Sequence, residues 1–207
     1  MAQRINLSDD GASFITLHTL PDDLKEYGVD AFNTLFNLHP EERGKVQMQD
    51  GEVESPRWHK SYLNTPKFDP TLHHSYMFSG HDDSNIRDAL PDAFLPFLKY
   101  VNRDNAGYDQ VVINWYKDGQ DYTAQHSDCE VSMEEGADIV LISLGDERLF
   151  KIRPKTLPHA EDLKISCPHG SVLTMGGHTQ KLFRHGVPKS ASEAPRISIT
   201  FRKFKKH

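Results

Sequence analysis

The sequence predicts a mainly β protein with flanking helices (α+β), in which a β-barrel or β-sandwich occupies the second half of the chain. Short β-branched and aromatic segments, separated by turn residues, follow one another from Gln110 onward. Two stretches of the first half instead place apolar residues at helical spacing. The length of 207 residues fits a single domain with its own hydrophobic core.

The two expected helices cover Leu20–Leu38 and Pro91–Asn102. Pro21 suits an early position of the first helix. The apolar stripe of the first helix consists of Leu24, Tyr27, Ala31, Leu35 and Leu38. The stripe of the second consists of Phe94, Leu95, Leu98 and Val101. Because both stripes precede the strand-rich half, the helices are expected to lie against one face of a sheet.

Six strands are expected after Gln110, on their β-branched and aromatic composition. Their segments are 111–116, 137–144, 148–152, 171–175, 181–187 and 196–204. Gly145 and Asp146 separate the second segment from the third, and this pair predicts a two-residue hairpin turn.

The composition argues against several classes of protein. No run approaches the roughly 20 apolar residues of a membrane span, and the first residues lack the apolar stretch of a secretory signal. Cys129 and Cys167 cannot form a disulfide framework, so an intracellular location, cytoplasmic or nuclear, is expected. The net charge of −6 argues against tight, non-specific binding to duplex DNA. The basic terminal segment KFKKH could contact phosphates or simply be solvated.

The first motif with chemical content is His126-Ser127-Asp128. Residues i and i+2 of a strand point to the same side, so the imidazole and the carboxylate would converge on one point. Taken alone, the motif is also compatible with an ordinary surface pair, because the chain holds 12 histidines.

A distal histidine would complete a site of two imidazoles and one carboxylate. This is the facial triad of non-haem Fe(II) oxygenases, which leaves coordination positions open for a co-substrate and dioxygen. Spacing alone does not select His185 over His169 or His178. His185 is preferred because it lies in an apolar, strand-like run, where an imidazole needs a partner. A histidine satisfied within the core is the alternative.

The last expected strand alternates cleanly between polar and apolar residues. Arg196, Ser198, Thr200 and Arg202 share one face of it. Two arginines on one strand face suit a dicarboxylate, because guanidinium binds carboxylate bidentately and stays charged when buried. The alternative is an edge strand with a solvated polar face.

A similar face is expected on the segment 111–116. Asn114 and Tyr116 share one side, with Trp115 on the other. An amide and a phenol on an inner wall could complete the hydrogen bonding of an acid co-substrate, or be satisfied within the core.

The order of these pieces is Asn-x-Tyr, His-x-Asp, a distal His and Arg-x5-Arg. Together with the segments INWYKDGQDYTAQHSDCE, GGHTQKLFRHGVPK and PRISITFRK, this order resembles the AlkB family of Fe(II)/2-oxoglutarate dioxygenases. The resemblance covers about Val111–Lys203, and more loosely Pro56–Gly80. It implies a double-stranded β-helix, or jelly roll, with N-terminal helices and lid strands, whose site lies inside the barrel mouth.

The resemblance also implies roles for individual residues. His126, Asp128 and His185 match the iron ligands. Arg196 matches the arginine that pairs with the distal carboxylate of 2-oxoglutarate. The remaining co-substrate contacts match Asn114, Tyr116 and Arg202. The implied cofactors are therefore Fe(II), the co-substrate 2-oxoglutarate and O2.

For the substrate, the resemblance implies a flipped nucleotide held by lid strands. Glu130 falls where demethylating members often place an acidic residue that reads the base edge. Tyr76, Trp58 and Tyr62 lie in the two lid-like segments, where an aromatic ring could stack on a base. Such aromatic residues are also ordinary core residues.

The function implied is oxidative demethylation of N-alkylated bases in DNA or RNA, with release of formaldehyde, succinate and CO2. The alternative is an oxygenase of the same fold that acts on a small molecule or a protein side chain. A catalytically silent binding module is a third reading. No strand-separating segment is recognisable, which favours single-stranded nucleic acid, and a monomer without a membrane partner is expected.

The single domain, 1–207, is expected to have three parts. These are an N-terminal helical or lead-in segment (1–55), lid strands with a supporting helix (56–109), and the jelly-roll dioxygenase core (110–207).

Overall fold

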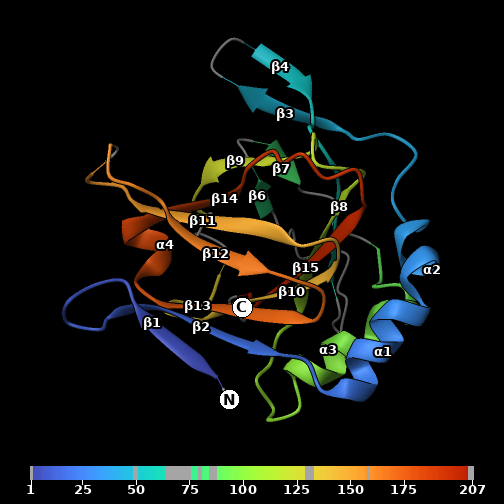
Figure 1. Cartoon of the computed structure of the whole chain (residues 1–207), viewed down its shortest axis with the longest axis horizontal. Helices are drawn as coiled ribbons and strands as arrows, with labels where there is room; N and C mark the ends of the chain where they lie inside the picture. Colours follow the sequence, from blue (N-terminus) through green and yellow to red (C-terminus); the bar gives the residue numbers. More distant parts are fainter. Residues whose placement is uncertain are drawn as a thin grey trace.

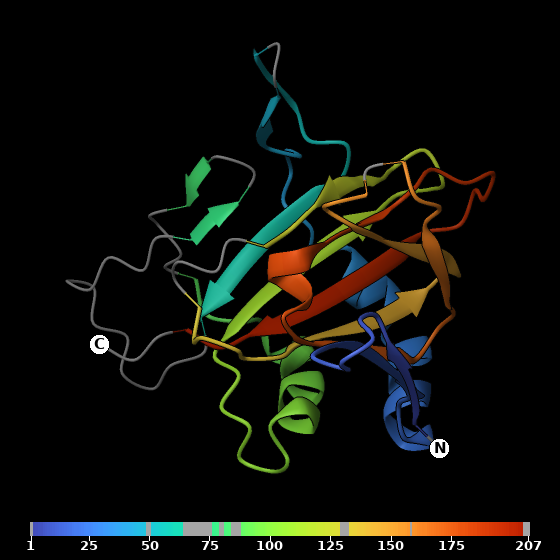
Figure 2. The same ribbon diagram turned by 90° about the vertical axis from the view of Figure 1, so that its left-hand side faces the viewer.

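Two antiparallel sheets form the body of the protein in the computed structural model (Figures 1 and 2). The structure describes residues 2–48, 51–63, 76–78, 81–83, 88–128, 133–157 and 159–204. The sheets have seven and four strands, and two further pairs of strands stand apart from them. The mainly β prediction is confirmed.

The larger sheet collects strands from the whole length of the chain. Its order is β1-β2-β13-β10-β15-β8-β5, and each neighbouring pair is antiparallel. The strands span Gln3–Asn6 (β1), Ser13–Thr19 (β2), Ser171–Gly177 (β13), Ile139–Gly145 (β10), Arg196–Arg202 (β15), Gln110–Tyr116 (β8) and Trp58–Leu63 (β5). The strands β1 and β2, which were not predicted from the sequence, extend this sheet beyond β13.

The smaller sheet has the order β12-β11-β14-β9. Its strands span Leu163–Cys167 (β12), Arg148–Pro154 (β11), Phe183–Val187 (β14) and Thr123–His126 (β9). A shared apolar cluster joins the two sheets, since Phe150 and Ile165 of the smaller pack with Leu141, Leu173 and Met175 of the larger. The space between the sheets is therefore a packed core, into which alternate residues of each strand point.

Helices cover the outer face of the larger sheet, on the side away from the smaller sheet (Figure 1). They are α1 (Asp22–Asp30), α2 (Phe32–Phe36), the short 3-10 helix η1 (Asp92–Phe94) and α3 (Leu95–Val101). Trp115 of β8 is buried beneath them, and its indole N–H donates to the carbonyl of Leu35 at 2.9 Å. The expected helix Leu20–Leu38 is thus two helices divided at Ala31, whose ψ of −1° redirects the chain so that Leu35 reaches the core.

The predicted hairpin at Gly145-Asp146 is wrong. Both edges of β10 are already occupied, by β13 and β15, so β11 cannot pair with it and belongs to the smaller sheet. The chain crosses between sheets at Gly145, which has a φ of +82°. The backbone N–H of Asp146 donates to the carbonyl of Pro195 across this crossing.

The expected strand 181–187 begins later than predicted. A short helix, α4 (Thr179–Leu182), precedes β14, so only Phe183–Val187 is extended. The separate strand pairs are β3 (Lys45–Met48) with β4 (Gly51–Glu54), and β6 (Tyr76–Phe78) with β7 (His81–Asp83). Within the described ranges, none of the helices has the length and apolar character needed to cross a membrane.

Candidate metal and co-substrate site

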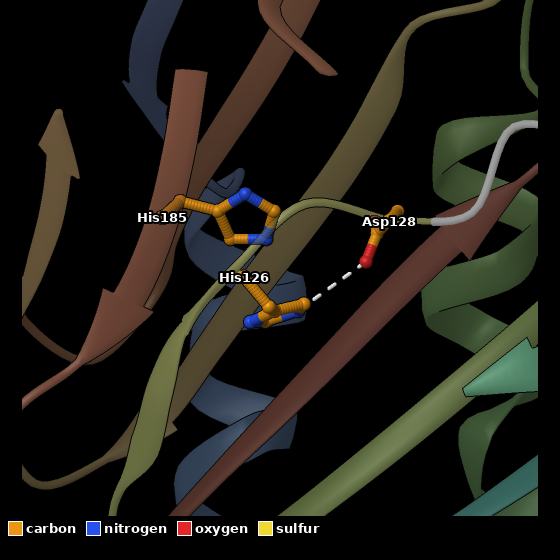
Figure 3. A group of neighbouring side chains, drawn as sticks. All are labelled: His126, Asp128 and His185. Atoms are coloured by element: carbon orange, nitrogen blue, oxygen red, sulfur yellow. Dashed lines mark ion pairs between the residues drawn. The ribbon is translucent and has the colours of Figure 1, made fainter. Parts of the chain in front are cut away.

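The three predicted metal ligands meet between the sheets. His126 ends β9, Asp128 follows two residues later, and His185 lies in the middle of β14, directly opposite His126 in the strand pairing. One ligand atom from each residue lies within 4.8 Å of the other two. Figure 3 shows the three side chains pointing toward one another.

The other candidate histidines lie elsewhere. The imidazole of His169 bridges two backbone groups: Nδ1 accepts from the N–H of Gly145 at 3.0 Å, and Nε2 donates to the carbonyl of Lys25 at 3.0 Å. His178 stands at the N-terminal end of α4. The geometry therefore selects His185, which spacing alone could not do.

Hydrogen bonding orients the ring of His126. Its Nδ1 lies 2.9 Å from the carbonyl oxygen of Ala124, and a carbonyl only accepts, so Nδ1 carries the proton. Nε2 is the ring nitrogen that faces Asp128, and it lies 3.4 Å from Oδ1 of that residue. A second hydrogen bond that sets the tautomer is a regular feature of metal-binding histidines.

His185 is held by ring contacts. Its ring stacks on Phe150, with centroids 5.4 Å apart and planes 18° apart, and it lies 4.5 Å from the ring of His126. Burial, reinforced by His126, lowers the pKa of His185 to about 3. The imidazole is therefore neutral at physiological pH, which is the form that binds a metal ion.

Asp128 is an ionised carboxylate in a buried position. Burial alone would raise its pKa, but the Arg202 guanidinium and the neighbouring histidines lower that pKa well below its usual range. Nε and Nη2 of Arg202 both donate to Oδ2, at 3.1 and 2.8 Å. The pairing leaves Oδ1 on the side of the histidines.

A pocket opens beside this cluster, and the strand faces predicted from the sequence line it. Asn114 and Tyr116 contribute from β8, and Ser198, Thr200 and Arg202 from β15. The intervening residues Trp115, Ile197, Ile199 and Phe201 belong to the opposite, helix-covered core. The apolar part of the lining is Val112, Leu141, Phe150, Met175 and Val187.

Two polar residues of the lining have partners within the protein. Asn114 accepts from Nε of Arg57 at 2.7 Å, and the Tyr116 hydroxyl lies 2.8 Å from that of Thr123. Arg57, for which no individual role was predicted, is 3 % exposed and also lines the pocket. Arg57 directly precedes β5, and no local pattern in the sequence singles it out.

Arg196 is paired with Tyr116 across strands β15 and β8, and its guanidinium carbon lies 5.0 Å from the centroid of the Tyr116 ring. The side chain is 1 % exposed and its Nε donates to the Ser143 hydroxyl at 2.9 Å. Its Nη1 is buried and has no hydrogen-bond partner within the described part of the chain. A buried guanidinium nitrogen in this state fits the carboxylate of an acidic ligand.

A second buried arginine, Arg148, has its guanidinium carbon 5.6 Å from the centroid of the Tyr116 ring. No sequence motif singled it out, because it is the first residue of an ordinary strand, β11. Its guanidinium donates to the backbone carbonyls of Asp118, Asp121 and Pro188. It therefore holds the loop after β8 against the segment that leads into β15.

The structure does not place Trp58 or Tyr62 in the pocket, which corrects their prediction as stacking residues. Trp58 pairs with Trp115 and Tyr62 with Val111, so both point to the helix-covered core. The Trp58 ring is already in contact with His39, at 4.1 Å, and with the guanidinium of Arg43, at 4.5 Å. The alternation of strand faces is the physical reason.

The other two residues predicted to contact the substrate are Tyr76 and Glu130. Tyr76 lies in β6, where its backbone pairs with Asp83 of β7. Glu130 falls outside the described residues.

The donor set fits the cofactors of one family of enzymes. Two imidazole nitrogens and one carboxylate oxygen suit Fe(II), and the buried Arg196 suits an acidic co-substrate. The family model described as the 2OG-Fe(II) oxygenase superfamily matches residues 24–202. The chain belongs to this superfamily, and Fe(II), 2-oxoglutarate and O2 are its cofactors.

Several curated proteins are similar in sequence to part of this chain. The chain is 36 % identical to "Alpha-ketoglutarate-dependent dioxygenase alkB homolog 3" of Bos taurus, over 52 % of this chain and 41 % of that protein. It is 33 % identical to "DNA oxidative demethylase ALKBH2" of Bos taurus, over 63 % and 49 %, and 32 % identical to the Homo sapiens protein, over 63 % and 52 %. The chain spans about half the length of these relatives. The predicted resemblance to the AlkB family is confirmed.

The solved structure of OsALKBH1 has a similar fold. The TM-score is 0.58 at 17 % identity, over 91 % of this chain and 96 % of that one. This likeness supports the jelly-roll fold, which agrees with the two facing antiparallel sheets.

Proposed function

We propose that the protein is an Fe(II)/2-oxoglutarate-dependent dioxygenase that oxidatively demethylates N-alkylated nucleobases in DNA or RNA, releasing formaldehyde, succinate and CO2. The observation that carries the oxygenase chemistry is the converging group of His126, Asp128 and His185 beside a buried arginine. The similarity to an alkB homolog 3 and to a DNA oxidative demethylase supports the nucleic-acid substrate.

In this proposal the three converging residues hold the iron. When bound, Fe(II) supplies the redox chemistry that activates dioxygen with 2-oxoglutarate as co-substrate. Arg196 binds the distal carboxylate of 2-oxoglutarate, with Asn114 and Tyr116 as further contacts. Arg202 contacts the co-substrate from the pocket wall and also fixes the orientation of Asp128, with which it pairs.

Glu130 and Tyr76 remain the candidates for base recognition. Arg57 joins them because it is buried and lines the pocket. We infer a single-stranded methylated nucleic acid, a monomeric enzyme and an intracellular location, cytoplasmic or nuclear. The last of these is supported by the low cysteine content of the sequence.

A same-fold oxygenase acting on a small molecule or a protein side chain is the second candidate. The net charge of −6 favours it, because most nucleic-acid-binding proteins are basic.

The test is a panel of methylated DNA and RNA oligonucleotides, single- and double-stranded, incubated with Fe(II) and 2-oxoglutarate. Mass spectrometry follows the loss of the methyl group, and formaldehyde and succinate are measured in parallel. We expect demethylation with equal amounts of both products. If none of the oligonucleotides changes the rate of succinate production, the result would support the second candidate instead.

Two variants assign the result to residues. His126→Ala is expected to abolish metal binding and succinate production, because a three-ligand site has no protein ligand to spare. Glu130→Ala is expected to lower demethylation while leaving metal binding and substrate-free succinate production near those of the unmodified protein. Retained metal binding in the first variant would show that the ligands are misassigned.

A further inference from the structure

The three proposed iron ligands belong to two separate segments of the chain. His126 and Asp128 come from the end of β9 and the residues after it, whereas His185 comes from β14. Strand pairing places His126 opposite His185. Asp128 lies beyond the end of β9, so the sheet hydrogen bonds do not position its backbone.

Two side-chain hydrogen bonds position it instead. The backbone N–H of Asp128 donates to Oε1 of Gln180 at 3.1 Å. The Ser127 hydroxyl donates to the backbone carbonyl of Phe183 at 2.8 Å. Both acceptors belong to the α4–β14 segment, which also carries His185.

Gln180 is well placed for this purpose. The residue is 6 % exposed, and its Nε2 lies 3.3 Å from the sulfur of Met175, which leaves Oε1 turned toward Asp128. Its backbone carbonyl accepts from Nζ of Lys155 at 2.7 Å. Met175 of β13 therefore orients the Gln180 side chain, and Lys155, which follows β11, anchors the Gln180 backbone.

We propose that Gln180 is a positioning residue of the iron site: its side chain holds the Asp128 backbone at a set distance from His185 and so determines metal affinity. The inference rests on the proposed ligand set. Loss of a residue that hydrogen-bonds to a metal ligand typically lowers metal affinity or activity by roughly 10- to 100-fold.

The competing explanation is that Gln180 merely stabilises α4. The neighbouring residue Thr179 separates the two explanations, because it is 1 % exposed and its hydroxyl bonds the carbonyl of Gly176 at 2.6 Å. Thr179→Val removes a buried hydrogen bond of the same helix without touching the Asp128 segment. It is the matched control for Gln180→Met, which keeps the approximate side-chain volume and removes the acceptor.

The experiment titrates Co(II), a spectroscopic probe for the Fe(II) site, into the metal-free protein and its variants, without co-substrate or nucleic acid. We expect Gln180→Met to weaken Co(II) binding roughly 10- to 100-fold, and Thr179→Val to leave it unchanged. The visible absorption of bound Co(II) is expected to change in Gln180→Met, because the carboxylate is displaced. Equal weakening in both variants, or unchanged binding in Gln180→Met, would overturn the proposal.

Ser127→Ala gives a second measurement at an incompletely buried position, in case Gln180→Met fails to fold. It is expected to weaken Co(II) binding less than Gln180→Met and to leave the thermal midpoint of the protein nearly unchanged. Unchanged Co(II) binding in Ser127→Ala would then count against positioning of Asp128 by this segment. His126→Ala serves as the reference: if it binds Co(II) normally, the ligand set itself is wrong, and the failure belongs to the proposed function.

Discussion

Burial and charge conflict at Arg196. Its guanidinium is 1 % exposed, and Nη1 has no partner in the described part of the protein. A buried charge without a counterion is costly, so the position is favourable only when an anion occupies it. The distal carboxylate of 2-oxoglutarate would supply that charge.

Arg196→Met should therefore weaken 2-oxoglutarate binding far more than metal binding. Removing one partner of a buried charge pair costs about 2–5 kcal/mol or more, which corresponds to a loss of roughly 30-fold or more in affinity. Calorimetric titration of 2-oxoglutarate into the metal-loaded protein measures this affinity for 2-oxoglutarate. Arg103→Met, at an arginine whose side chain is 53 % exposed, is the control. Unchanged 2-oxoglutarate affinity in Arg196→Met would move the assignment to Arg202.

Residue-scale prediction worked best where the signal was local. The alternation along β15 and β8 placed Arg202, Asn114 and Tyr116 on the pocket side. The same alternation along β5 carries Trp58 and Tyr62 to the other face, but the sequence alone did not show which face of β5 continues the pocket side of β8. The phase relative to β8 was not available, because the pairing between β5 and β8 joins residues some 50 positions apart.

At the scale of elements, the crossing at Gly145 sets how the two sheets are connected. A Cβ atom there would lie 2.5 Å from the Phe32 ring and 2.6 Å from the carbonyl oxygen of Pro195. The φ of +82° is also unfavourable for any residue with a side chain. The sequence pair Gly-Asp is common in hairpins, yet here the glycine serves a close approach of α2 and the segment before β15.

Gly145→Ala should lower the free energy of unfolding by about 2 kcal/mol or more, because backbone strain and overpacking both contribute. Urea denaturation measures the change. Gly107→Ala is the matched control, since Gly107 has a φ of +79° but nothing within 4 Å of its added Cβ. If the two variants lose the same stability, the contact with Phe32 contributes nothing and only the backbone conformation matters.

The element boundaries that the sequence missed have a common cause. The helix α4 ends directly at β14, and its four residues are too few to show a helical period. The N-terminal strands β1 and β2 are recognisable only by their pairing with each other and with β13. Short elements of this kind are stabilised by their neighbours more than by their own sequence.

At the scale of the whole molecule, two buried tyrosines make stability depend on alkaline pH. Burial, with Asp88 nearby, raises the pKa of Tyr62 to about 12, and burial, with Asp138 nearby, does the same for Tyr108. In the unfolded chain both ionise near pH 10. Stability is therefore full below pH 10 and falls as the pH rises toward 12, because the unfolded state loses its protons first.

Urea denaturation at intervals from pH 8 to pH 12 should show this decline. The double variant Tyr62→Phe with Tyr108→Phe is expected to flatten the curve between pH 10 and 12, since phenylalanine has no proton to lose. A curve of unchanged slope in the double variant would mean that other groups cause the alkaline loss.

The sequence by itself determined the class of fold, the faces of the site-bearing strands and the chemical identity of the iron and 2-oxoglutarate site. These follow from local periodicity and from residue types whose order along the chain is distinctive. Only the tertiary structure decided that His185 meets His126, that β10 and β11 lie in different sheets, and that Gln180 reaches Asp128. Each of these depends on which distant segments pair, and strand pairing is a non-local choice that no local pattern encodes.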